Sequence, residues 1–126
     1  RGWAGERPHP VAHFANFPLP AQRGDFGGGV VDQMSRDEVL VVLFEYGKES
    51  VGQALFATLG LPRSLRPDHF HPRALQQVLP GQAGHQTFFT QAGRAFCLYV
   101  VLGSRANARK LVGQVNQVLA ATKIEP

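Results

Sequence analysis

Two stretches of this 126-residue chain are apolar at consecutive positions. Residues 39–46, VLVVLFEY, and residues 95–102, AFCLYVVL, carry large apolar side chains at odd and even positions alike. Because the side chains of a strand alternate between two faces, strands of this kind need cover on both sides. We therefore predict that both segments lie in the centre of a sheet, between two covering layers.

Further strands are predicted around this central pair. Residues 11–17 alternate loosely and predict a first strand, and residues 30–34, VVDQM, predict a short second one. Residues 85–103 indicate a β-hairpin that turns near Ala92 and Gly93, with a register that the loop alone does not define. The sheet is therefore expected to be mostly antiparallel.

The segment after the first central strand has the features of a helix. Ser50 and Gln53 form a capping box, and Gly60 suits the end of the helix. The apolar residues between them fall on one stripe: Val51, Ala54, Leu55 and Leu59. A second, short helix is predicted to begin at Pro72, with Leu75, Val78 and Leu79 on one face.

The last part of the chain predicts the longest helix. Ser104 is a good N-cap, and apolar residues then recur at the helical period from Ala108 to Leu119. Arg109, Lys110, Gln114 and Gln117 take the outer side. The fold class is therefore predicted as α+β: a mostly antiparallel sheet with helices packed on it, including a C-terminal amphipathic helix. Residues 10–126 form this single domain, after a lead-in or linker over residues 1–9.

Charge and composition narrow the possible partners. The net charge is +4, and ten of the 13 basic residues are arginines scattered along the chain, which predicts a solvated basic surface. Weak attraction to an anionic surface is compatible with this pattern, whereas a nucleic-acid interface would gather its basic residues. No apolar run is long enough to span a membrane. Cys97 is the only cysteine, so an intrachain disulfide is excluded, and its place within an apolar strand predicts a buried, inert thiol.

The most chemically suggestive segment is RPDHFHPRAL, residues 66–75. His69 and His71 have a spacing found in metal sites, and His85 with Asp68 could complete a ligand shell. A structural interpretation explains more of the segment, because His71 falls at the N-cap of the short helix and Asp68 suits an Asx-turn. We favour that interpretation and predict no metal and no cofactor. The loop-rich surface formed by residues 62–73 and 81–85 is the candidate ligand-binding surface, with Arg63, Arg66, His69, Phe70, His71, Arg73 and His85 as its candidate residues.

Other motifs have simpler structural interpretations. RGD at residues 23–25 is a short chance match, and GGG at residues 27–29 is expected to be a flexible connection rather than a phosphate loop. His9 and His13 are placed on a linker and a strand, where they would not share a face. Glu45, inside an apolar strand, is expected to form a salt bridge with Arg94 or another arginine. No pair of carboxylates indicates a general acid and base, and none of these residues is predicted to be catalytic.

Three segments carry a family resemblance. FFTQAGRAFCLYVVLGS followed by an amphipathic helix, together with NFPLP and LFEYG, resembles small uncharacterised extracytoplasmic domains of bacterial membrane-anchored proteins. The order of elements is also similar to that of the photosystem accessory protein PsbP and its relatives. The resemblance implies a location outside the cytoplasm, tethered or secreted, and a binding or accessory role. Residue 1 is not Met, and the leading hypothesis is that a signal or anchor segment precedes it, with Trp3 in a juxtamembrane linker. A hydrophobic segment encoded upstream would support this location, whereas its absence would favour the alternative of a cytoplasmic protein.

The leading functional hypothesis is therefore a non-enzymatic extracytoplasmic binding or accessory domain for a protein or small ligand. One alternative is a metal-assisted hydrolase that uses His69, His71 and His85. Another is a module that binds nucleic acid or another anionic polymer, for which affinity should fall steeply with salt.

Overall fold

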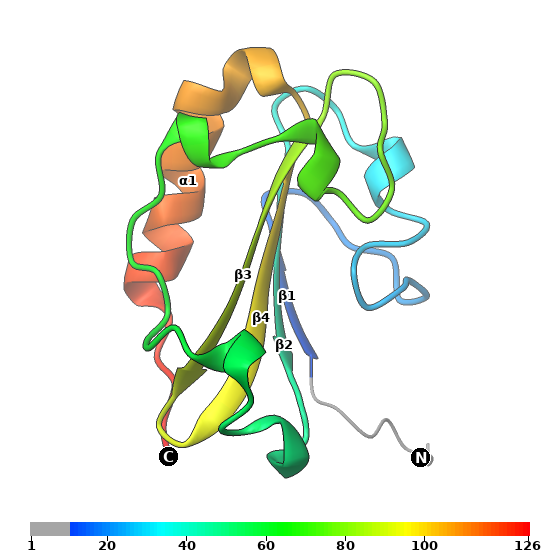
Figure 1. Cartoon of the computed structure of the whole chain (residues 1–126). Coiled ribbons are helices and arrows are strands. Elements are labelled where there is room, and N and C mark those ends of the chain that lie inside the picture. The colour runs from blue at the N-terminus through cyan, green and yellow to red at the C-terminus, as the bar shows by residue number, and fades with distance from the viewer. Residues whose placement is uncertain (1–10) are drawn as a thin grey trace.

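A computed structural model describes residues 11–126 and has a four-stranded antiparallel sheet at its centre, in the order β1-β2-β4-β3 (Figure 1). The strands are β1 (Val11–Ala15), β2 (Val39–Glu45), β3 (Ala83–Gln91) and β4 (Arg94–Leu102). One α-helix, α1 (Ala108–Ala121), packs on the sheet, which confirms the α+β fold class. The predicted lead-in over residues 1–9, with Trp3 and His9, lies outside the described residues.

Six single 3₁₀ turns complete the secondary structure of the described residues. They are Val31–Gln33, Lys48–Ser50, Ala54–Phe56, Pro67–His69, Pro72–Ala74 and Arg105–Asn107. The last of these leads directly into α1, so the helical segment begins one residue after Ser104, as predicted. The Ser104 side chain, however, makes no capping hydrogen bond.

The two strands that are apolar on both faces occupy the middle of the sheet, as predicted. β2 lies between β1 and β4, and β4 lies between β2 and β3. Every residue from Ala95 to Leu102 is buried. On one face, Val39, Val41, Leu98 and Val100 pack against the apolar side of α1, which presents Leu111, Val112, Val115 and Leu119. On the other face, Leu40, Val42, Tyr99 and Val101 pack against Val31 and Leu75.

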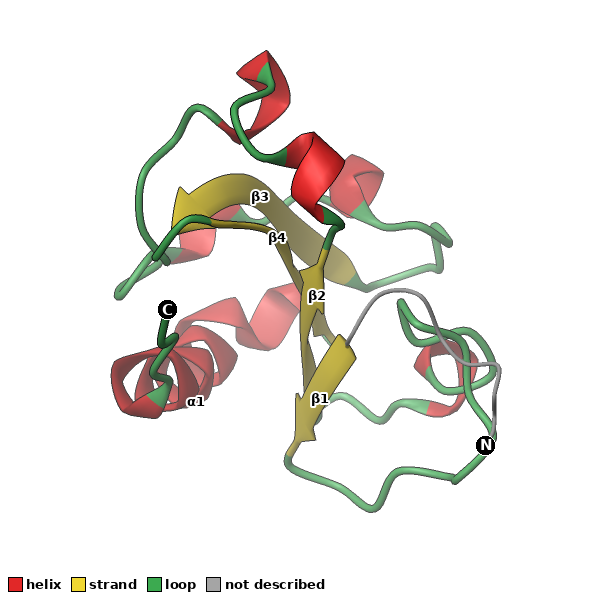
Figure 2. Ribbon diagram, turned by 90° about the horizontal axis from the view of Figure 1, so that it is seen from below, coloured by secondary structure: helices red, strands yellow, loops and turns green. Residues whose placement is uncertain are grey.

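The second covering layer consists of loops and 3₁₀ turns rather than helices. Figure 2 shows α1 on one side of the sheet and the long connection between β1 and β2 on the other. The expected strand over residues 30–34 is the turn Val31–Gln33 in this connection, where Val31 is buried against the sheet. Helices on both faces are therefore not needed, because irregular segments can bury enough apolar side chains to close the core.

The predicted helix after Ser50 is wrong. The chain forms two 3₁₀ turns there, and Gly52, with φ +91°, breaks the helical path between them. The helical stripe has no surface to cover, since Leu55 and Leu59 are 58% and 82% exposed. Phe56, which that stripe leaves out, is the buried residue instead. A short helix gains most of its stability from packing of its apolar face, so the capping residues Ser50 and Gln53 alone do not stabilise a helix here.

The helix predicted from Pro72 is only the turn Pro72–Ala74. His71 takes the N-cap position as expected, and its Nδ1 accepts a hydrogen bond from the Arg73 amide at 3.4 Å. Leu75 is buried, but Val78 is exposed, so no continuous apolar face continues beyond the turn.

The hairpin of β3 and β4 is confirmed, and its register is now defined. Gln91 pairs with Arg94, which leaves Ala92 and Gly93 as a two-residue turn. Both have positive φ angles, 54° and 73°, as a type I′ turn requires.

Candidate functional site

The predicted ligand-binding residues lie on and beside a segment that covers the outer edge of β3. We call this segment, residues 58–71, the strap. At one end, the Thr90 amide donates to the Thr58 carbonyl at 2.8 Å, and the Gly60 amide donates to the Thr90 carbonyl at 2.9 Å. At the other end, His71 and Gly84 exchange two backbone hydrogen bonds of 2.8 and 3.0 Å. The strap therefore satisfies part of the β3 edge by backbone pairing.

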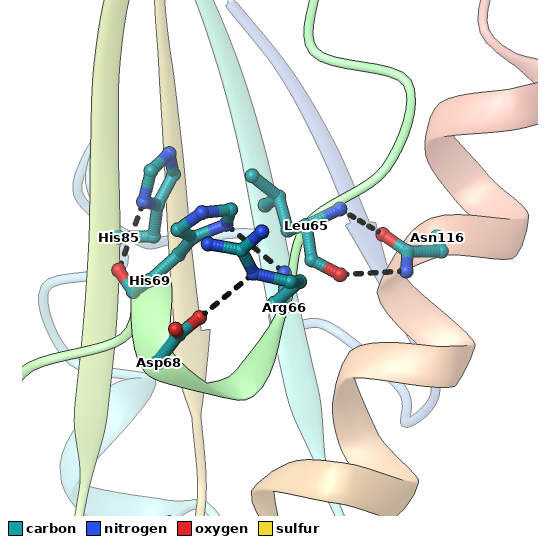
Figure 3. A network of polar contacts seen from close by, with 6 residues as sticks. All are labelled: Leu65, Arg66, Asp68, His69, His85 and Asn116. Atoms are coloured by element: carbon teal, nitrogen blue, oxygen red, sulfur yellow. Dashed lines mark hydrogen bonds and ion pairs between the residues drawn. The ribbon is translucent and has the colours of Figure 1, made fainter.

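The middle of the strap is held on α1 by two side chains. The Asn116 amide accepts from the Leu65 backbone N–H at 2.8 Å and donates to the Leu65 carbonyl at 3.0 Å (Figure 3). The Arg63 guanidinium donates to the carbonyls of Leu119 and Thr122 at the end of α1, at 2.9 and 2.5 Å. Arg63 thus gives the Thr122 carbonyl a partner and adds a second donor to the Leu119 carbonyl, which also accepts from the Thr122 amide at 3.3 Å.

His69 and His85 are brought together at the other end of the strap (Figure 3). Their ring centroids are 6.1 Å apart, and the Phe70 ring lies 5.7 Å from His85. His69 Nδ1 accepts from the Arg66 amide at 3.0 Å, so it fixes the turn that begins there. The Arg66–Asp68 ion pair, at 3.1 Å, is largely exposed and contributes little to stability.

The hydrogen bonds of His85 define its neutral tautomer. Its Nδ1 lies 3.1 Å from the His69 carbonyl, which can only accept, so Nδ1 carries the proton. Its Nε2 then accepts from the Thr87 hydroxyl at 2.5 Å. Burial lowers the pKa of His85 below its ordinary value of 6.5; the bond to the His69 carbonyl opposes this shift, and the charge of the His69 ring adds to it. The folded protein therefore favours neutral His85.

This preference predicts a loss of stability in mild acid. Below pH 6.5 the unfolded chain protonates this histidine more readily than the folded chain, so stability falls as the pH decreases toward the lowered pKa. In His85→Asn, whose amide can still donate to the His69 carbonyl, we expect a smaller fall between pH 7.5 and 5.5. Urea titrations of both proteins at several pH values would measure it, and identical pH profiles would contradict the prediction.

The remaining candidate residues do not extend the histidine pair into a larger cluster. Phe70 is buried in the core under α1, so its side chain is not available on the surface. His71 and Arg73 are exposed and joined to each other at the next turn. Within the described part of the chain, no group of three or more His, Cys, Asp and Glu side chains is arranged to hold a metal ion.

Two predictions about single side chains are confirmed. Glu45 forms a two-pronged salt bridge with Arg94, with distances of 2.8 and 2.7 Å, and this bond lowers the pKa of Glu45. Cys97 is buried in β4, and burial raises its pKa to about 12, so the thiolate needed for nucleophilic chemistry is disfavoured.

The glycine-rich connection is ordered by consecutive turns: the Gly24 amide donates to the Gly28 carbonyl, and the amides of Val30 and Val31 donate to the Gly27 carbonyl.

An open groove lies at the opposite edge of the sheet, between β1 and α1. Its volume is about 630 Å³. Its apolar lining comes from the sheet and the helix: Phe14, Ala15, Val39, Val41, Val118 and Ala121. Its polar lining consists of Asn16, Gln114, Gln117, Thr122 and Lys123. The groove exists because α1 packs over the central strands and leaves Phe14, on the edge strand, 39% exposed.

Asn16 builds one end of this groove. Its Oδ1 accepts from the Val39 amide at 2.9 Å, and its Nδ2 donates to the Asp37 carbonyl at 2.9 Å. The same Nδ2 lies 2.7 Å from Gln114 Oε1 on α1. One amide side chain thus joins the end of β1, the start of β2 and the helix.

The groove is not evident from the sequence. The outer position of Gln114 and Gln117 on the helix was predicted, but nothing placed them opposite Phe14. The one available signal was that residues 11–17 alternate only loosely and are not apolar on both faces, so this strand was not expected in the centre of the sheet.

No family model, curated protein or solved structure gives a significant match to this chain. None of the helices among residues 11–126 combines the length and apolar character needed to span a bilayer. Since no match tests them, the resemblance to extracytoplasmic domains and the location that it implies remain predictions.

Proposed function

We propose that this chain is a non-enzymatic binding or accessory domain, and that its partner binds in the groove between β1 and α1. The observation that carries the proposal is an open, mainly apolar hollow of about 630 Å³ with a few polar groups at its rim. Ligand sites in proteins usually have this size and this mixture of side chains.

The chemistry of the lining favours binding over catalysis. The amides of Gln114 and Gln117 can hydrogen-bond to a ligand, whereas that of Asn16 is already bonded to Val39, Asp37 and Gln114; none of these amides exchanges protons near neutral pH. The Thr122 hydroxyl already donates to the Val118 carbonyl at 2.7 Å. Of the described histidines, which could serve as acids or bases, His69, His71 and His85 lie on the strap and β3, away from the groove. His13 lies on β1, but it is not part of the groove lining, and both of its ring nitrogens are bonded, to the Asp25 carbonyl and the Arg23 guanidinium.

A search with small apolar fragments tests this proposal. Bound fragments should shift the amide NMR resonances of Val41, Val118 and Thr122, because these residues line the groove. Phe14→Asp should weaken binding by about tenfold, since it places a charge where apolar contact is needed. Leu59→Asp makes the same kind of change at an exposed leucine beside β3, outside the groove. It serves as the matched control and should leave the affinity unchanged.

Two results would contradict the proposal. Fragments could leave the groove resonances unmoved and instead shift those of His69 and His85. Alternatively, the protein could release product from a panel of hydrolase substrates, with the activity lost in His69→Ala.

A further inference from the structure

We propose that the partner is an extended, acidic peptide segment of another protein, which pairs with the outer edge of β1 as an added strand and places apolar side chains in the groove. This inference rests on the proposed function and names the class of ligand. Strand addition to an open sheet edge is a general mode of peptide recognition, in which backbone bonds supply affinity and side-chain pockets supply specificity.

The two edge strands of the sheet differ in whether another segment pairs with their outer backbone groups. β3 is covered by the strap through backbone bonds at Gly84 and Thr90. Among residues 11–126, β1 pairs only with β2, in an unbroken register from Val11–Phe44 to Ala15–Leu40. Exposed edge strands are usually protected from further pairing by charged residues, prolines or β-bulges. β1 contains no lysine, arginine, aspartate, glutamate or proline, and its register with β2 shows no bulge. Its outer backbone groups are therefore suited to a further strand.

The groove lies where the side chains of that strand would point. Ala12 and Phe14 alternate with partly buried neighbours along β1, and Phe14 faces the groove. A strand added about 4.8 Å beyond β1 would direct every second side chain toward the same face. From Gln114 to Thr122 the helical wall is roughly 12 Å long, the length of about four strand residues. The first and last Cα atoms of the five-residue β1 are about 13 Å apart, which is close to this length.

The charge of the groove favours an acidic partner over a second copy of this chain. Lys123 is the only charged residue of the lining, and no described residue forms an ion pair with it. Arg63 adds a second cation at the same end, through its bond to the Thr122 carbonyl. At the other end, Asp37 is already paired with Lys110 at 3.5 Å. A second copy would bring another net charge of +4 and a like-charged groove, whereas a carboxylate beside Lys123 would be attracted.

The test uses a phage-displayed library of random nine-residue peptides selected on the whole chain. We expect the selected peptides to alternate apolar residues and to carry Asp or Glu toward one end. A selected peptide should bind Lys123→Glu about tenfold more weakly, with a smaller difference at high salt. Arg109→Glu, which makes the same charge change on α1 outside the groove, is the matched control and should have little effect.

Hydrogen exchange of the complex tests strand addition directly. The bound peptide should slow exchange of the amides in Val11–Ala15 and leave the strap unchanged, and Phe14→Asp should abolish both binding and protection. If peptides bind in the groove without protecting β1, or without a preference for acidic residues, this inference is wrong while the binding function stands. If the chain forms a dimer that Phe14→Asp dissociates, the occupant is a second copy and this inference also fails. If neither fragments nor peptides bind in the groove, both this inference and the proposed function are wrong.

Discussion

Replacement of Phe89 by alanine is expected to lower the free energy of unfolding by about 3 to 5 kcal/mol. Phe89 is fully buried between the sheet and α1, and its ring stacks on Phe96 with 5.2 Å between centroids. The ring belongs to the core cluster that the central strands, α1 and the strap form together, so the alanine variant would leave a cavity inside that cluster. Because small domains are stable by only about 5 to 15 kcal/mol, this loss would remove much of the total.

Urea unfolding of the wild type and Phe89→Ala would measure the difference. Leu59→Ala is the matched control, since it also shortens an apolar side chain but one that is exposed; its effect should stay within about 0.5 kcal/mol. Equal midpoints for the two variants would show that the cluster under α1 is not packed as described.

The second large effect is expected for Gly103→Ala, with a loss of about 3 kcal/mol. Gly103 follows β4, and its amide donates to the Glu38 carbonyl at 2.8 Å. A methyl group at this position would overlap the Ser35 carbonyl oxygen and lie 3.0 Å from the Glu38 carbonyl oxygen. Both are backbone atoms, so no side-chain rotation can relieve the overlap.

Gly113→Ala provides the control with the same chemical change. Gly113 lies on the exposed side of α1, where an added methyl group meets nothing within 4 Å. In a helix this substitution should raise stability by about 0.5 to 1 kcal/mol, so the two variants should shift the thermal midpoint in opposite directions. A Gly103→Ala protein as stable as the wild type would mean that the carbonyls of Ser35 and Glu38, in the turn before β2, do not approach Gly103 so closely.

The residues that looked most functional in the sequence serve the scaffold in the folded chain. Arg63 binds helix carbonyls, and His69 and His85 hold backbone and hydroxyl groups of the strap and β3. An irregular segment that covers a sheet edge has many backbone groups to satisfy, and polar side chains with fixed geometry can satisfy them. This role explains why arginines and histidines gather in the strap without forming a reactive cluster.

The sequence by itself determined the two central strands, the hairpin at Ala92 and Gly93, the C-terminal helix and the burial of Cys97. Each of these features depends on a local pattern of neighbouring residues: the alternation of a strand, the periodicity of a helix or the residues of a turn. The Glu45–Arg94 pair could also be anticipated, because a carboxylate in an apolar strand needs a cation nearby.

Only the tertiary structure decided which strands lie at the edges, that no helix forms after Ser50, and that a groove opens beside Phe14. A strand becomes an edge through its pairing with segments far away along the chain, and a capped amphipathic segment becomes a helix only if a surface is available to bury its stripe. The groove depends on the lateral position of α1 over β2 and β4. That position follows from the packing of both elements together, and no local pattern of residues encodes it.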